Sequence, residues 1–161
     1  MAKGIRKNQY STDGVLVRSI IGGIIGDIAG STREGYGSNT PYPISILTAS
    51  SYFTDDSALT IAVADWLNNK DTIDLKTCLL KWSHLYPYVG FGGRFKTFME
   101  NGEPQESNAN GGAMRVAPLA IVANTLEDAL AMAEDQCLVT HTTEIAITGA
   151  KAIAAAVFLA K

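Results

Sequence analysis

The chain has 161 residues, of which 47% are hydrophobic and 18% charged, a balance typical of one globular domain with a sizeable core. Its 13 Lys and Arg against 16 Asp and Glu give a net charge of −3, which argues against nucleic acid and acidic membrane surfaces as partners. No apolar run approaches the roughly 20 residues that span a bilayer, and no signal peptide is predicted.

The first third of the chain divides into a polar start, a helix and a loop. Residues 1–14 are polar and lack periodicity, so we expect a flexible leader, with the domain itself over residues 15–161. A helix is predicted over residues 15–29, and close contact with another helix would explain its three glycines. Residues 30–51 are rich in Gly, Ser, Thr and Pro and predict a long loop, a type of segment that often carries function.

The rest of the chain is dominated by helical periodicity. Helices are predicted over residues 54–68, 75–86, 111–124, 126–139 and 144–160. Because strand-like alternation is nearly absent, the fold class is predicted to be all-α. The last helix is apolar nearly all round, so we expect it to be covered on most sides by more chain or by another subunit.

The two cysteines, Cys78 and Cys137, predict the redox environment. They lie far apart, without a second thiol or histidine at zinc-ligand spacing. Neither a disulfide framework nor a structural zinc site is therefore expected, and a cytoplasmic location fits best.

Thr54, Asp55 and Asp56 form the sharpest local cluster, because three hard oxygen donors stand at the start of a helix. Magnesium prefers such ligands, and a rigid helix start can supply part of its octahedral shell. The alternative is plain capping, with Thr54 as N-cap and the two aspartates favoured by the helix dipole. Taken alone, these three residues favour capping, and it is the other motifs that favour a metal site.

Two glycine-rich loops each run into a helical pattern. The first spans residues 88–94 and the second residues 108–118, and backbone N–H groups in such loops can converge on phosphate. Taken alone, the first loop favours an ordinary flexible turn, whereas the two loops together could hold the two ends of a diphosphate-linked ligand. Arg115 is interpreted either as a phosphate ligand or as part of an internal ion pair, and His141 as a residue that lines the pocket.

Five motifs, taken in chain order, resemble the ADP-ribosylglycohydrolase family. They are residues 26–31 with Glu34, residues 54–56, residues 90–93, residues 110–115 and Thr140-His141. The resemblance covers residues 15–161 and implies a compact helical bundle with two magnesium or manganese ions at the mouth of a cleft.

The same resemblance implies a role for each matching residue. Thr54, Asp55 and Asp56 would bind metal, and Glu34 would act with Asp55 and Asp56 in catalysis. The substrate-binding residues would be Gly90, Phe91, Gly92, Gly93, Asn110, Gly111, Gly112, Ala113, Met114 and His141.

The reaction implied is metal-assisted hydrolysis of the glycosidic bond between ADP-ribose and a modified protein side chain. Family members complete the metal site with an Asp-x-Asp-Thr or Asp-x-Asp-Ser motif near the C-terminal end, and this sequence has none. We therefore expect an incomplete domain, with a second chain or a downstream fragment over the last helix. The alternatives are a non-catalytic ADP-ribose-binding module and a helical interaction protein.

Overall fold

The computed structural model describes residues 12–34 and 46–161, with the side chains of the first helix described from Ile20 onward. Its elements are α1 (Thr12–Gly30), η1 (Ser31–Arg33), α2 (Asp55–Asn69), α3 (Leu75–Leu85), α4 (Gly93–Asn101), η2 (Asn110–Gly112), α5 (Ala117–Val122), α6 (Leu126–Leu138) and α7 (Glu144–Ala160). Within these ranges the only β-type pairing is an isolated bridge between Gln105 and His141. The prediction of an all-α fold is confirmed.

Most helix starts are stabilised by N-cap side chains that can be recognised in the sequence. The side chain of Asp74 accepts a hydrogen bond from the third residue of its helix at 2.7 Å, and that of Thr125 does the same at 3.1 Å. Thr143 caps α7 in the same way, and Thr54 caps α2 by accepting from the N–H of its second residue. Each contact satisfies a backbone donor that has no partner inside the helix. The end of α4 is also set by a local residue, because Gly102 adopts the left-handed conformation with φ 70° that commonly ends a helix.

Three expectations about the helices need correction. Helix α1 begins at Thr12, inside the predicted leader, and residues 1–11 lie outside the described part. The helix predicted over residues 111–124 is a 3-10 turn followed by a restart at α5, because proline near the start of α5 cannot continue an earlier helix. Close helix contact does not explain the α1 glycines, since no described atom lies within 4 Å of a Cβ built at any of them.

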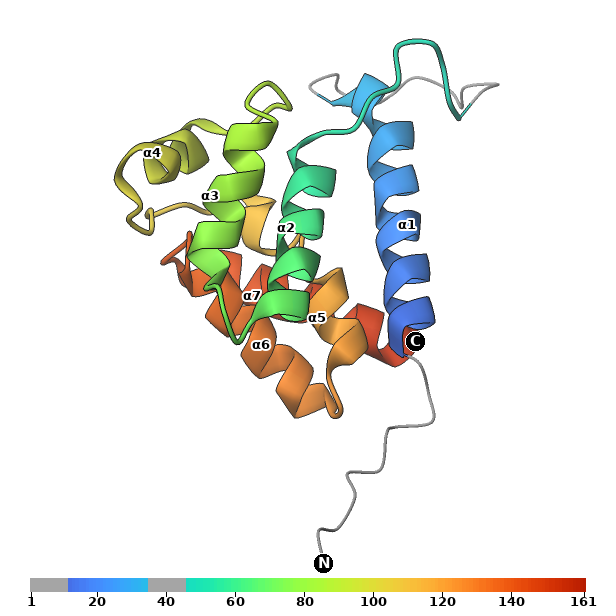
Figure 1. The fold of residues 1–161 in the computed structure, drawn as a ribbon, viewed down its shortest axis with the longest axis vertical. Helices are drawn as coiled ribbons and strands as arrows, with labels where there is room; N and C mark the ends of the chain where they lie inside the picture. Colours follow the sequence, from blue (N-terminus) through green and yellow to red (C-terminus); the bar gives the residue numbers. More distant parts are fainter. Residues whose placement is uncertain (1–11, 35–45) are drawn as a thin grey trace, which may run out of the picture.

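Two apolar clusters hold the helices together, and Figure 1 shows α2 and α3 side by side with α6 and α7 crossing beneath them. The first cluster joins α2, α3, α4 and α5 through large side chains: Leu59, Val63, Leu75, Leu79, Phe91, Phe95, Phe98 and Leu119. The second joins α5, α6 and α7 through mostly small ones: Val116, Ala120, Ala133, Cys137, Ala146, Ile147, Ala150 and Ala154. Small residues let the α6 and α7 backbones approach closely, which sets the position of the loop between them.

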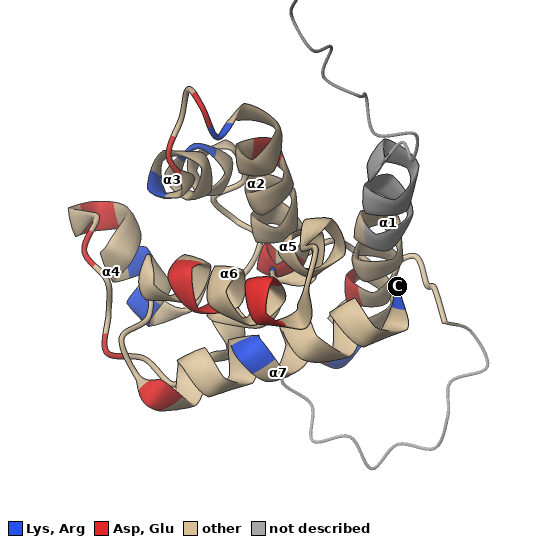
Figure 2. Cartoon of the chain, turned by 90° about the horizontal axis from the view of Figure 1, so that it is seen from below, with Lys and Arg blue, Asp and Glu red and all other residues tan. Residues whose placement is uncertain are grey.

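The outer face of α7 is open within this chain, so its expected cover by more chain or by another subunit stays a prediction. Ile145, Ile153 and Leu159 are 66%, 48% and 74% exposed. Figure 2 shows α7 running along one side of the bundle with few charged residues. Among the described helices, none is long and apolar enough to cross a membrane.

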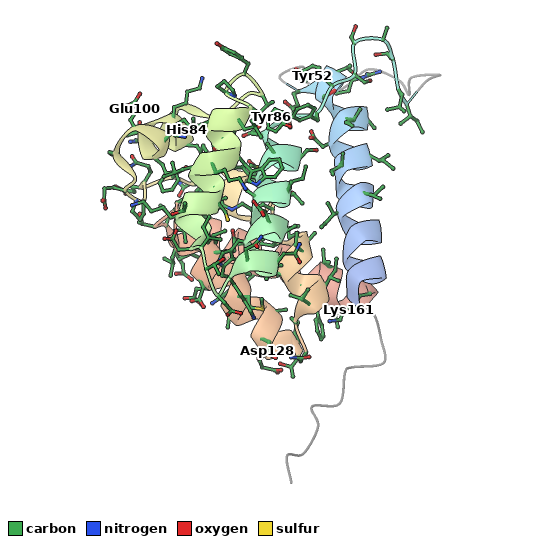
Figure 3. All side chains as sticks on the ribbon, viewed as in Figure 1. Tyr52, His84, Tyr86, Glu100, Asp128 and Lys161 are labelled. Carbon is green, nitrogen blue, oxygen red and sulfur yellow. The ribbon has the colours of Figure 1, made fainter. Side chains whose placement is uncertain are left out.

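The two ends of the bundle differ in character. Figure 3 places Tyr52 and Tyr86 at one end, where the chain enters α2, and Lys161 at the other. The Lys161 ammonium donates to the carbonyls of Ala123 at 2.6 Å and Ile121 at 3.2 Å and so closes the end of α5. The predicted acidic cluster lies at the Tyr52 end.

Candidate functional site

The start of α2 is held by a carboxylate from another helix. Asp27, in the last turn of α1, accepts hydrogen bonds from the backbone N–H of Thr54 at 2.8 Å and from its hydroxyl at 2.6 Å. It also accepts from the N–H of Ser57 at 3.2 Å and from the Ser57 hydroxyl. Four hydrogen bonds to one carboxylate make a strong connection between the two helices. Asp27 therefore fixes the position of α2 against α1.

Asp55 and Asp56 follow directly and lie in a field of like charge. Burial, reinforced by the neighbouring carboxylates, raises the pKa of Asp56 to about 6. Burial likewise raises the pKa of Asp55, with smaller contributions from Glu34 and Asp27. The charged neighbours that shift both pKa values are all carboxylates. Such an arrangement favours a bound cation, which would relieve the repulsion.

Thr54 acts as a helix cap in this structure. Its hydroxyl donates to Asp27 and accepts from the N–H of Asp56 at 3.3 Å, and its side chain is 1% exposed. The capping interpretation is confirmed, while metal binding through the remaining lone pair stays a prediction. In the described ranges no group of three or more His, Cys, Asp and Glu side chains is arranged to hold a metal ion. The donor chemistry of these oxygen atoms suits a divalent cation.

A cavity of about 180 Å³ opens beside this cluster. It is lined by Asp55, Leu59, Gly92, Gly93, Arg94, Phe95, Ser107, Ala109, Asn110, Gly111, Met114 and His141. Asp55 is the residue that belongs both to the carboxylate cluster and to the wall of the cavity. The acidic cluster and the two glycine loops therefore share one site.

The first glycine loop is fastened to the start of α2. The N–H of Asp55 donates to the carbonyl of Val89 at 3.0 Å. Gly90 then turns the chain with φ 104°, a conformation that disfavours residues with a side chain, and Gly92 is the N-cap of α4. The first turn of α4 lies at the wall of the cavity as a result.

The second loop depends on two glycines for its close packing. A Cβ at Gly111 would lie 2.9 Å from Cε1 of His141, and a Cβ at Gly112 would collide with Sγ of Cys137. The Gln136 amide donates to the carbonyl of Gly112 at 2.6 Å and ties the loop to α6. Contact with α6 and with the α6–α7 loop is what brings His141 to the cavity.

The structure brings most of the predicted substrate-binding residues to the cavity and leaves others behind. On its wall are Gly92, Gly93, Asn110, Gly111, Met114 and His141. Not on its wall are Gly90, Phe91, Gly112 and Ala113. Phe91 is 2% exposed and stacks on Phe95 at 5.1 Å, so it is a core residue. Glu34 and Asp56 are not on the wall, but the carboxylate of Glu34 raises the pKa of both Asp55 and Asp56.

Ser107 and Arg94 line the cavity although sequence reasoning did not select them. The Ser107 carbonyl accepts from the hydroxyl of Thr143 at 2.7 Å, which ties the segment before η2 to the start of α7. Arg94 is the second residue of α4 and stays exposed. Arg94 ends the first glycine motif, so its position could have been inferred, whereas no pattern marks Ser107.

Arg115 takes neither of the roles considered for it. It does not line the cavity, and within the described part of the chain it forms no ion pair with a carboxylate. It is fully buried and donates to Gln136 and to Thr140. Burial lowers its pKa to about 10, and the neighbouring His141 has its pKa lowered to about 4 by burial and by this cation.

The ADP-ribosylglycohydrolase family model matches residues 14–160 of the chain. This chain belongs to the ADP-ribosylglycohydrolase family. A search of curated proteins gave no significant match. Membership places the chain among glycohydrolases that act on ADP-ribosylated substrates and are generally metal-dependent. The all-α architecture agrees with that assignment.

Proposed function

We propose that this ADP-ribosylglycohydrolase chain binds the ADP-ribose unit of a modified protein and hydrolyses its glycosidic bond to the side chain. The observation that carries the proposal is the position of Asp55, at once part of a mutually repelling carboxylate cluster and of the cavity wall. A cation site and a ligand site therefore adjoin, as metal-assisted hydrolysis requires. Both cysteines are free and buried, in agreement with the cytoplasm as the proposed compartment.

Thr54, Asp55 and Asp56 are the residues we propose to hold Mg²⁺ or Mn²⁺. The raised pKa values of the two aspartates mark a place where positive charge is favoured, and hard oxygen ligands suit both ions. When bound, the cation would supply charge stabilisation and orient sugar hydroxyls or water. A two-metal centre, as implied for the family, would need ligands beyond these three.

The cavity suits one portion of ADP-ribose rather than the whole molecule. Its volume of about 180 Å³ lies below the roughly 300–1,000 Å³ of pockets that enclose drug-sized ligands. The N-terminus of α4 at Gly92 and Gly93, with the guanidinium of Arg94, offers a suitable position for the diphosphate. Asn110, on the second glycine loop, and His141, on the α6–α7 loop, supply further donors.

The acidic residues supply the chemistry at the scissile bond. A carboxylate can accept a proton from attacking water and stabilise positive charge as the sugar gains oxocarbenium character. Glu34, Asp55 and Asp56 are the candidates for these tasks. Asp27 is already occupied by four hydrogen bonds, which makes it a supporting residue.

The test is release of ADP-ribose from arginine-linked and serine-linked ADP-ribosylated proteins in the presence of Mg²⁺. We expect release by the wild type, its loss in Asp55→Asn, and its retention in Asp65→Asn, a substitution on the same helix at a surface ion pair with Lys81. Binding of ADP-ribose without release would contradict hydrolysis by this chain and favour a non-catalytic binding module.

A second candidate function is association with another polypeptide through α7. Its exposed Ile145, Ile153 and Leu159 form an apolar face of the kind found at interfaces. Sedimentation velocity on the wild type and on Ile153→Asp tests this. A mass above the monomer that falls in the variant supports a second copy as partner, and a monomer in both rules out self-association.

A further inference from the structure

A buried chain of polar groups leads from Arg115 to His141. The Arg115 guanidinium donates through Nε to the Gln136 side chain at 2.7 Å and through Nη2 to the Gln136 carbonyl at 3.0 Å. Nη2 also donates to Oγ1 of Thr140 at 2.7 Å, and this oxygen lies 2.7 Å from Nδ1 of His141. All four residues are at most 4% exposed. The cation is thus buried among neutral partners in the described structure.

The position of each proton in this chain follows from the donors available. Arginine only donates, so Oγ1 of Thr140 must accept from it. The single hydroxyl proton of Thr140 then has two destinations, Nδ1 of His141 at 2.7 Å and the carbonyl of Cys137 at 3.5 Å. The shorter contact has the ordinary length of a strong hydrogen bond, and the longer one lies at the limit. Were Nδ1 to donate instead, the second lone pair of Oγ1 would accept from it and the hydroxyl proton would be left with only the 3.5 Å contact. The arrangement that gives the hydroxyl proton a good partner has Nδ1 as acceptor and the proton of the neutral ring on Nε2.

The other edge of the ring faces the cavity. Cε1 and Nε2 of His141 lie so close to Gly111 that a Cβ there would stand 2.9 Å and 3.2 Å from them. His141 lines the cavity, and no described residue bonds to Nε2. An N–H on this atom is consequently available to a ligand between the two glycine loops.

We propose that Arg115 and Thr140 are positioning residues that hold His141 in the Nε2-protonated neutral tautomer, so that the ring donates a hydrogen bond to an oxygen acceptor of the bound ligand. This role rests on the proposed function only for the identity of the ligand, in which a ribose hydroxyl or a phosphate oxygen would be the acceptor. The tautomer itself is a property of the free protein. Gly111 provides the space that the ring occupies.

Long-range ¹H–¹⁵N correlation spectra of the full chain, labelled with ¹⁵N-histidine, read the tautomer at neutral pH. The chain has two histidines, and His84→Gln assigns the signals of His141. We expect a single Nε2–H tautomer in the wild type and in Thr140→Ser, and a mixture in Thr140→Val. Thr142→Val is the matched control, because the Thr142 hydroxyl contacts only the Gln105 carbonyl, at 3.4 Å, and its loss should leave the spectrum unchanged.

Titration with ADP-ribose separates this inference from the proposed function. We expect Thr140→Val to bind about tenfold more weakly than Thr142→Val, the value of one neutral hydrogen bond. An Nδ1–H tautomer or a cationic ring in the wild type overturns the inference, whether or not ADP-ribose binds. A wild type with the expected tautomer and no affinity for ADP-ribose overturns the proposed function and leaves the positioning role standing. The wild-type spectrum decides the tautomer even where Thr140→Val fails to fold.

Discussion

Replacing Asp56 by asparagine should stabilise the metal-free protein. Asp56 stands in the first turn of α2, where a negative charge ordinarily contributes about 0.3–1 kcal/mol through the helix dipole. If Asp56 served only as a helix-start residue, its neutralisation would destabilise the fold by that amount. The raised pKa of Asp56 indicates the opposite sign, because burial and three neighbouring carboxylates outweigh the dipole.

The magnitude follows from the shift in pKa. A rise from 3.8 to about 6 corresponds to at most about 3 kcal/mol at ~1.4 kcal/mol per unit, and solvent screening of this half-buried group reduces it to about 1–2 kcal/mol. The described structure shows no hydrogen bond to the Asp56 carboxylate that asparagine would lose. The folded state favours the protonated form of Asp56, so ionised Asp56 destabilises the wild-type fold. This destabilisation is complete above pH 6 and disappears as the pH falls to about 4.

Urea unfolding of the wild type and of Asp56→Asn in EDTA, at pH 7.5 and at pH 4, measures the effect. We expect the variant to be more stable by about 1–2 kcal/mol at pH 7.5 and equal to the wild type at pH 4. Asp65→Asn should show the reverse, since Lys81 and Trp82 hydrogen bonds lower the pKa of Asp65 and its loss destabilises the fold at pH 7.5. If Asp56→Asn is less stable than the wild type at pH 7.5, the argument that this carboxylate cluster favours a bound cation is refuted.

Three further predictions concern helix capping, the second glycine loop and cation binding. Thr54→Val should cost about 2–3 kcal/mol in urea unfolding and Thr125→Val about 1 kcal/mol, because the Thr54 hydroxyl has a buried charged partner and the Thr125 cap is exposed; equal losses would contradict this. Gly112→Ala should cost about 1–3 kcal/mol and distinctly less in a Cys137→Ala background, and additive losses in a double-mutant cycle would show that the two residues do not collide. Millimolar MgCl₂ should raise the melting temperature at pH 7.5 more than at pH 5, where Asp56 gains a proton; a pH-independent rise would place the ion elsewhere.

Local signals in the sequence predict much of the fold. The sequence predicts helix starts at Thr54, Asp74 and Thr125, and in the structure the side chain of each caps its helix. For helix α7, periodicity predicts an apolar helix but cannot report what covers it, so the expected cover stays a prediction. Exposed Ile153 and buried Ala154 are both apolar and differ only in the direction that they face.

The site shows the same division between local and tertiary information. The residue types around Asp55 and Asn110 suggest oxygen ligands and a close backbone, and both residues reach the cavity. Phe91 sits inside a glycine motif and nevertheless turns into the core, because its side chain gains more from Phe95 and Leu79 than from solvent. The role of Asp27 depends on contact across 27 and 30 positions of sequence to Thr54 and Ser57, which no local pattern records.

The account rests most directly on cation-dependent binding of ADP-ribose next to Asp55, and calorimetric titration of the purified chain tests it. The titration is run once with millimolar MgCl₂ and once with EDTA. We predict that the wild type binds ADP-ribose with micromolar affinity and that EDTA weakens this binding. In MgCl₂, Asp55→Asn should also weaken the binding, while Asp65→Asn should leave it unchanged. Absence of binding in both buffers, or binding that neither EDTA nor Asp55→Asn affects, would contradict the account.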